Sequence, residues 1–250
     1  ELARRGMEVI VHGRTEKRAT DAAEDIRKEA PEARLEIASG DLASLEQVQM
    51  LADDITTRFD SLEVLINNAG VMTNTRRESE DGYELTFAVN HLAHFLLTNL
   101  LLDTMISSAP SRIITVSSMV HASGEIRLDD LQMRRGYNGY RAYAQSKLAN
   151  VLFTYELARR LEGTGVTANA LHPGVIGTKL LHVSFSGGGP TAEGARTPVY
   201  LASSPDVAET SGTYFSNERP QRSSSLSYDE SLAKRLWQVS EELTGFKKGE

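Results

Sequence analysis

Short runs of β-branched and aliphatic residues alternate with amphipathic helical segments along almost the whole sequence. The runs typical of strands are residues 7–12, 33–38, 62–66, 112–116, 166–171 and 213–216. The helical segments between and after them are residues 15–29, 44–59, 82–107, 143–161, 191–202 and 229–244. Because this alternation indicates a parallel sheet with helices on both faces, we predict a doubly wound, Rossmann-type α/β fold.

The chain shows no internal repeat, low-complexity segment or linker, and 250 residues suit one α/β domain. We therefore predict a single domain over residues 1–250, with a substrate-loop region at residues 179–198. The net charge of −7 and the lack of a basic stripe argue against nucleic-acid binding. The absence of cysteine excludes disulfides and thiolate chemistry and fits the cytoplasm. The apolar stretch at residues 95–102 is too short to span a membrane.

Polar and glycine-containing turns follow most of the predicted strands. They contain Arg14, Asp41-Leu42, Asn67-Asn68-Ala69-Gly70, Ser117-Ser118 and Pro173-Gly174. Ligands of doubly wound sheets bind outside the carboxyl ends of the strands, where these turns would meet. The spacing therefore predicts one binding site along that edge of the sheet.

Tyr143 and Lys147 lie four residues apart on a predicted helix, so their side chains share a face. A cation beside a phenol favours the phenolate and lowers the phenol pKa, which would let Tyr143 exchange protons near neutral pH. Taken alone, the pair is weak evidence, because Tyr and Lys are common residues and more often share a helix surface by chance. The convergence of the strand-end turns favours the catalytic interpretation.

Together these residues resemble the short-chain dehydrogenase/reductase family, in the order of that family and over nearly the whole chain. The matching residues are Asp41-Leu42, Asn67-Asn68-Ala69-Gly70, Asn90, Ser118, Tyr143, Lys147 and residues 173–178. Residues 119–150 resemble the retinol-dehydrogenase-like branch in particular. The resemblance also implies a strand and a Gly-rich phosphate turn before Glu1, and without them we expect a gap in the sheet.

The resemblance implies hydride transfer between a nicotinamide and an alcohol or carbonyl group. It assigns Tyr143 as the proton donor, Ser118 as a hydrogen-bond donor to the same substrate oxygen, Lys147 as the group that lowers the Tyr143 pKa, and Asn90 as the holder of a water. Ser117 competes with Ser118, because adjacent strand residues face opposite sides. Plain structural roles stay open for all of these residues.

The cofactor-binding residues are also implied by the resemblance. They are Asp41 and Leu42 at the adenine, Asn67, Ala69 and Gly70 near the adenosine ribose, Tyr143 and Lys147 at the nicotinamide ribose, and Pro173, Gly174, Ile176 and Thr178 at the carboxamide. His, Asp and Glu show no metal-ligand spacing, so we predict no metal.

Arg14 is the residue that we expect to select NADP(H) over NAD(H). NAD-specific sites usually place an acid at the end of this strand, where it binds the ribose 2′-hydroxyl. The sequence here ends in His12-Gly13-Arg14, and an arginine can hold a 2′-phosphate with a charge-assisted fork. Lys17 and Arg18 would be weaker helpers. A solvated turn arginine is the alternative.

We therefore predict an NADP-dependent oxidoreductase for a small lipophilic alcohol, aldehyde or ketone. Residues 121–140 and 179–198 would border its substrate, and Met119, Leu180, Val183 and Phe185 suggest an apolar lining, with the glycine run at 187–189 as a lid. Apolar residues run more than halfway round helices 87–102 and 143–161, which suggests a homodimer or homotetramer. The alternatives are a non-catalytic nucleotide-sensing or scaffold protein on this fold, and another doubly wound enzyme such as a methyltransferase.

Overall fold

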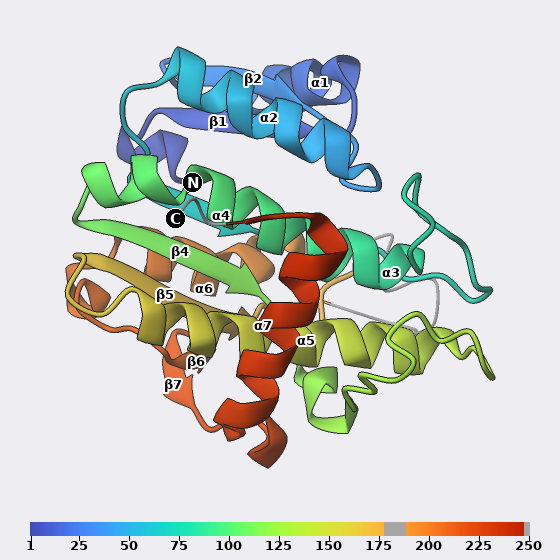
Figure 1. The fold of residues 1–250 in the computed structure, drawn as a ribbon. Helices are drawn as coiled ribbons and strands as arrows, with labels where there is room; N and C mark the ends of the chain where they lie inside the picture. The colour runs from blue at the N-terminus through green and yellow to red at the C-terminus, as the bar shows by residue number, and fades with distance from the viewer. Residues whose placement is uncertain (178–188, 248–250) are drawn as a thin grey trace.

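The computed structural model describes residues 1–177 and 189–247 and confirms the doubly wound α/β architecture. Its main elements are β1 (Val9–Gly13), α1 (Glu16–Glu29), β2 (Leu35–Ser39), α2 (Leu45–Arg58), β3 (Val64–Asn67), α3 (Leu85–Phe87), α4 (Ala93–Ser107), β4 (Ser111–Val116), α5 (Gly139–Arg160), β5 (Val166–His172), α6 (Thr191–Ser203), β6 (Tyr214–Ser216), β7 (Arg219–Gln221) and α7 (Glu230–Thr244). Helices α2, α4 and α5 cover one face of the strands, and α6 covers the other (Figure 1).

The strands form two sheets rather than one. Strands β3, β4, β5 and β6 are parallel neighbours, and β7 adds an antiparallel edge. Within the described residues, β1 pairs only with β2, so the division falls between β1 and β3. This is the gap that the sequence analysis predicts. Strand β7 was missed because it has three residues and contains Pro220, which suits only an edge strand.

The long helix predicted over residues 82–107 begins later and is irregular. The Glu84 carboxylate caps its start by accepting hydrogen bonds from Thr86 N and Phe87 N. A π-helical turn then spans Ala88–Leu92 before α4 continues. Such turns are frequent at functional sites, and this one contains Asn90.

The run Leu85–Ser107 is long and apolar enough to cross a bilayer by composition, with a mean hydropathy of 1.4 in its most apolar window. The prediction from residues 95–102 alone underestimated this length. In the structure, 83% of that window is buried inside the protein. The helix is therefore explained as a core helix, as in soluble α/β domains.

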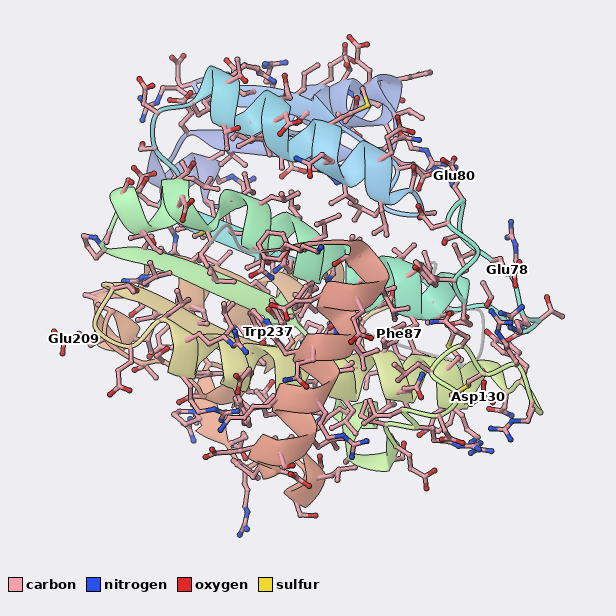
Figure 2. The ribbon with its side chains drawn as sticks, viewed as in Figure 1. Glu78, Glu80, Phe87, Asp130, Glu209 and Trp237 are labelled. Atoms are coloured by element: carbon pink, nitrogen blue, oxygen red, sulfur yellow. The ribbon has the colours of Figure 1, made fainter. Side chains whose placement is uncertain are left out.

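Helix α7 packs across the outer face of α4 and α5 (Figure 1). Trp237, labelled in Figure 2, lies on α7, and its ring centroid is 4.9 Å from that of Phe95 and 5.7 Å from that of Phe153. The guanidinium of Arg160 lies 4.1 Å over the Trp237 ring. Helix α7 therefore covers the apolar surface that suggested an oligomer. A homo-oligomer stays a prediction, but this apolar surface no longer supports it.

Phe95→Ala is expected to destabilise the fold strongly, because Phe95 is fully buried between α4, α5 and α7. Removing a buried phenyl ring of this kind costs about 3–5 kcal/mol through lost burial and the cavity left behind. Denaturant unfolding followed by circular dichroism would measure the loss. Met50→Ala is the control: Met50 is 62% exposed on α2, so its change should stay within about 0.5 kcal/mol. Equal effects of both substitutions would contradict this packing.

Candidate active site

The carboxyl ends of the strands open into one pocket of about 1040 Å³. It extends from the β1–α1 turn to the turn after β5, as the rule for doubly wound sheets predicts. Most of the predicted site residues line it: Arg14, Arg18, Asp41, Leu42, Ala69, Gly70, Ser118, Tyr143, Lys147, Pro173, Gly174 and Ile176. The structure therefore brings together residues that are more than 160 positions apart in the sequence.

Helix α5 carries Tyr143 one turn after its start. The Asn138 side chain caps the helix by accepting a hydrogen bond from Arg141 N at 3.0 Å. Gly124 directly follows the segment Met119–Ser123 and lies against the same helix. A Cβ on Gly124 would lie 2.5 Å from the Ala144 carbonyl oxygen, so the segment runs close to α5. This close approach sets Ser118 beside Tyr143.

The two serines at the end of β4 have different partners. The Ser117 hydroxyl is buried and donates to the Lys147 carbonyl oxygen at 2.7 Å. The Ser118 side chain hydrogen-bonds the Tyr143 phenol. Ser117 therefore has a structural partner, whereas Ser118 lines the pocket together with Tyr143.

Burial raises the pKa of Tyr143 to about 12, and the Ser118 hydrogen bond opposes this only in part. The Lys147 ammonium lies 5.6 Å from the centroid of the Tyr143 ring, over the ring itself. It is not among the causes that act on the Tyr143 pKa. Burial therefore dominates the Tyr143 pKa in the protein alone, and the expectation that Lys147 lowers this pKa stays a prediction.

Lys147 is 2% exposed, and its ammonium donates a hydrogen bond to the Val116 carbonyl oxygen at 2.9 Å. Burial lowers the pKa of Lys147 to about 8. An ammonium has three N–H donors, so this bond leaves others for a ligand in the pocket. A Cβ on Gly70 would lie 3.5 Å from the Lys147 ammonium nitrogen, so the Gly70 backbone passes close to this ammonium.

The Asn90 side chain hydrogen-bonds both the segment after Gly70 and helix α5. Its Oδ1 accepts a hydrogen bond from Val71 N at 2.7 Å, and its Nδ2 donates to the Val71 carbonyl oxygen at 3.0 Å and to the Ser146 hydroxyl at 2.9 Å. Asn90 itself does not appear in the pocket lining. The side chain therefore positions the wall of the pocket next to Lys147, and its role with a water stays a prediction.

Asn67 does not face the pocket as the resemblance implied. It is 2% exposed, and its Nδ2 donates to the Thr98 hydroxyl at 2.8 Å. Asn68 lines the pocket instead. The alternation of side chains at a strand end could have shown that only one of the two asparagines reaches the ligand side.

The pocket has an arginine end at the β1–α1 turn. Arg14 is exposed, with its Nε 3.9 Å from Asp41 Oδ2, and Arg18 lies nearby on α1. Lys17, the other expected helper, pairs with Asp21 at 2.9 Å and does not line the pocket. Gly13 permits the tight turn, because a Cβ there would lie 2.5 Å from Ala19 N.

The sequence analysis missed one wall of the pocket. It is formed by the segment between β3 and α3, including Met72, Arg77, Glu78 and Glu80, and Figure 2 labels both glutamates there. This segment has no hydrophobic period or turn motif from which its position could be predicted.

The substrate side is described in part. Met119, exposed by 57%, and Val120 line the pocket. Thr178, Leu180, Val183, Phe185 and the start of the glycine run at 187–189 lie outside the described residues. In the described part of the chain, no three His, Asp or Glu side chains gather as metal ligands would.

Lys147→Met is expected to stabilise the protein near neutral pH. The pKa of a lysine is 10.5 in the unfolded reference and about 8 here, so at pH 7 burial of the ammonium costs about 3 kcal/mol. Between pH 8 and 10.5 the unfolded chain binds more protons, so the unfolding free energy of the parent rises with pH and the gap to Lys147→Met closes. Urea unfolding across this range measures both curves.

Lys234→Met is the control, because Lys234 is a surface residue with 57% of its side chain exposed. Its unfolding free energy should run parallel to that of the parent at all pH values. If the difference in unfolding free energy between Lys147→Met and the parent did not change with pH, the Lys147 ammonium would not be buried as the structure shows.

Comparison with known proteins agrees with this geometry. The family model described as short chain dehydrogenase matches residues 1–187. Retinol dehydrogenase 14 of Mus musculus is 44% identical over 272 residues, which cover 99% of this chain and 81% of that protein. An uncharacterised protein from Mycobacterium paratuberculosis, known from its crystal structure, superimposes with a TM-score of 0.82 at 37% identity, over 100% of this chain and 88% of that one.

A gluconate 5-dehydrogenase from Burkholderia cenocepacia, solved with NADP and tartrate, shares the fold with a TM-score of 0.69 at 22% identity, over 86% of this chain and 85% of that one. The family model and the retinol dehydrogenase match cover the strand-end pocket and the helix that carries Tyr143 and Lys147. The chain belongs to the short-chain dehydrogenase/reductase family, in its retinol-dehydrogenase-like branch, and is an oxidoreductase of alcohols and carbonyl compounds.

Proposed function

We propose that the protein is an NADP-dependent reductase of lipophilic aldehydes or ketones, with Tyr143 as its acid. The observation that carries the proposal is the meeting of Ser118, Tyr143 and Lys147 in one pocket at the carboxyl edge of the sheet. A non-catalytic scaffold would not need a buried cation, a buried phenol and a serine at one point.

The residues present fit the two ends of such a cofactor. Lys147 has free N–H donors beside the Gly70 backbone, which suits ribose hydroxyls. Arg14 and Arg18 at the other end suit a 2′-phosphate. When bound, the reduced nicotinamide supplies the hydride, and the residues of this chain supply orientation and the proton.

The acid–base chemistry follows from the Tyr143 environment. With a pKa of about 12, the phenol is protonated at physiological pH and can give its proton to a carbonyl oxygen as negative charge develops there. Ser118, whose side chain hydrogen-bonds Tyr143, would hydrogen-bond the same oxygen and stabilise that charge. In the reverse reaction the phenolate would accept the alcohol proton.

The substrate class is argued from the pocket wall. Met72, Met119, Val120 and Val175 give the described lining an apolar character near Ser118. The relative at 44% identity is named for retinol, a lipophilic alcohol. We therefore propose a small lipophilic substrate, with the cytosol as the place of action and no nucleic-acid partner.

Tyr143→Phe is expected to lower kcat by about 100- to 10,000-fold, the range for loss of a general acid. The ring and its packing are kept, so the melting temperature and the cofactor affinity should change little. Turnover is measured by loss of NADPH absorbance with a panel of lipophilic aldehydes and ketones. Tyr140→Phe, one turn earlier and exposed, is the control and should keep its activity. Near-parental turnover of Tyr143→Phe would remove Tyr143 as the acid.

Arg14→Ala is expected to weaken NADPH binding by roughly tenfold or more, because a charged hydrogen bond to a phosphate is worth about 1.5–3 kcal/mol. NADH binding should barely change, since NADH has no 2′-phosphate. Titration of cofactor fluorescence gives both dissociation constants. Lys17→Ala is the matched control: Lys17 is exposed in the first turn of α1 but lies outside the pocket. Equal losses for the two cofactors would contradict the assignment of Arg14.

A further inference from the structure

The His121 side chain joins two segments that lie far apart in the sequence. Its imidazole is 4% exposed and belongs to the 3-10 turn Met119–Ser123, which follows Ser118. Nδ1 lies 2.6 Å from the Ser118 carbonyl oxygen, and Nε2 lies 3.0 Å from the backbone nitrogen of Ser224. The imidazole is therefore hydrogen-bonded at both of its nitrogens.

The two partners fix where the imidazole carries its proton. A carbonyl oxygen can only accept a hydrogen bond, so Nδ1 must donate to Ser118. A backbone N–H can only donate, so Nε2 must accept from Ser224. Burial lowers the pKa of His121, which keeps the imidazole neutral at physiological pH. His121 is therefore a neutral imidazole with its single N–H on Nδ1.

Ser118 lies just beyond the pairing of β4 with β5. That pairing ends where Ser117 N donates to the Leu171 carbonyl oxygen at 2.7 Å. The Ser118 carbonyl oxygen instead accepts from the backbone nitrogen and from the imidazole of His121, at 3.1 and 2.6 Å. One residue thus uses both lone pairs of this oxygen. Because the carbonyl and the side chain of Ser118 share one Cα, holding the carbonyl limits where the hydroxyl can point.

The other side of the imidazole rests on a segment that is attached to α5. Ser223 precedes Ser224, and its hydroxyl lies 2.7 Å from the Tyr155 hydroxyl of that helix. The Tyr214 ring of β6 packs on the imidazole of His121, with 4.7 Å between the ring centroids. The imidazole therefore spans a fixed distance between the turn after β4 and a segment held by α5, the helix that carries the proposed acid.

His121 does not line the pocket that contains Tyr143. Met119 and Val120 of the same turn line that pocket, whereas His121 lines a neighbouring cavity of about 590 Å³. An effect on the reaction must therefore pass through another residue, and Ser118 is the pocket residue that His121 bonds directly. A ligand held in the neighbouring cavity would instead make His121 a binding residue, which would appear as a change in KM.

We propose that His121 is a positioning residue for Ser118. Its Nδ1–H holds the Ser118 carbonyl, and its Nε2 takes its orientation from the Ser224 amide. A hydrogen-bond donor stabilises a developing oxyanion only within about 2.7–3.1 Å of that oxygen, so small movements of the serine matter. The catalytic effect rests on the proposed function, whereas the tautomer and the held turn are properties of the folded chain.

Two variants separate the two sides of the imidazole. The amide nitrogen of His121→Asn can take the place of Nδ1 and donate to the Ser118 carbonyl, but Asn is too short to reach Ser224. The amide oxygen of His121→Gln can take the place of Nε2 and accept from Ser224, which leaves the Ser118 carbonyl without its donor. We expect kcat to fall by roughly tenfold or more in His121→Gln and by less than about threefold in His121→Asn, with KM little changed, because a misplacement of about 1 Å can cost about 100-fold.

Trp237→Leu is the control for stability. It weakens the packing of α7 against Phe95 and Phe153 and keeps His121 with both of its partners. Its melting temperature should fall, while its kcat stays close to the parental value. Equal losses of kcat in His121→Asn and His121→Gln, or an equal loss in Trp237→Leu, would overturn the proposal. A rise in KM without a fall in kcat would also overturn it, because a ligand contact gives that result.

A double-mutant cycle shows whether the effect passes through Ser118. In Ser118→Ala the serine hydroxyl is already absent, so His121→Gln has no such group left to misplace. We expect less than about twofold further loss of kcat on that background, against roughly tenfold or more in the parent. Full additivity of the two losses would show that His121 acts elsewhere and would refute the positioning of Ser118.

The last experiment needs no substrate. Nitrogen NMR spectra of the His121 imidazole in the full chain should show one neutral tautomer, with its proton on Nδ1. Amide hydrogen exchange across residues 119–124 should speed up roughly fivefold or more in His121→Gln and less in His121→Asn, because only His121→Gln frees the Ser118 carbonyl. If no carbonyl compound is reduced but this pattern is found, the proposed function fails and the held turn stands. The other tautomer, or equal exchange in all variants, refutes the positioning role whatever the activity.

Discussion

The site depends on one charged group that is held out of water. The Lys147 ammonium lies inside the protein on the Val116 carbonyl oxygen, at the end of β4. An ammonium pays a large desolvation cost there, so the fold must supply fixed acceptors and keep the backbone around them rigid. The pairing of β4 with β3 and β5, and the Ser117 bond to the Lys147 carbonyl, provide that rigidity.

Much of the architecture was predictable because it rests on local rules. The alternation of strand and helix patterns gave the doubly wound fold, and the rule for strand ends gave the edge where ligands bind. The four-residue spacing of Tyr143 and Lys147 placed both on one helix face in the pocket. In the sequence, Ser118 was preferred to Ser117 only for its position in the Ser-Ser pair. The structure gives the two serines distinct partners.

The rest depends on effects that the sequence pattern does not contain. The Tyr143 pKa is a balance between burial and neighbouring charge, and spacing reports only the charge. The facing of Asn67 and Asn68 depends on where β3 ends. The apolar surplus of α4 and α5 suggested a second subunit, because periodicity shows that a face must be covered and not which element covers it. In this chain α7 does so.

The two pKa values bear on how the reaction starts. Tyr143 and Lys147 were expected to favour a phenolate beside an ammonium, yet burial moves the values to about 12 and about 8, which favours the two neutral side chains above pH 8. A neutral pair is the state that a dry pocket prefers, since separated charges cost most where water is absent. Proton transfer must therefore be driven by charge that arrives with the ligands. The developing negative charge on a carbonyl oxygen would draw the Tyr143 proton. Because the charge would arrive with the ligands, the protein can bury Tyr143 and Lys147 without an ion pair between them.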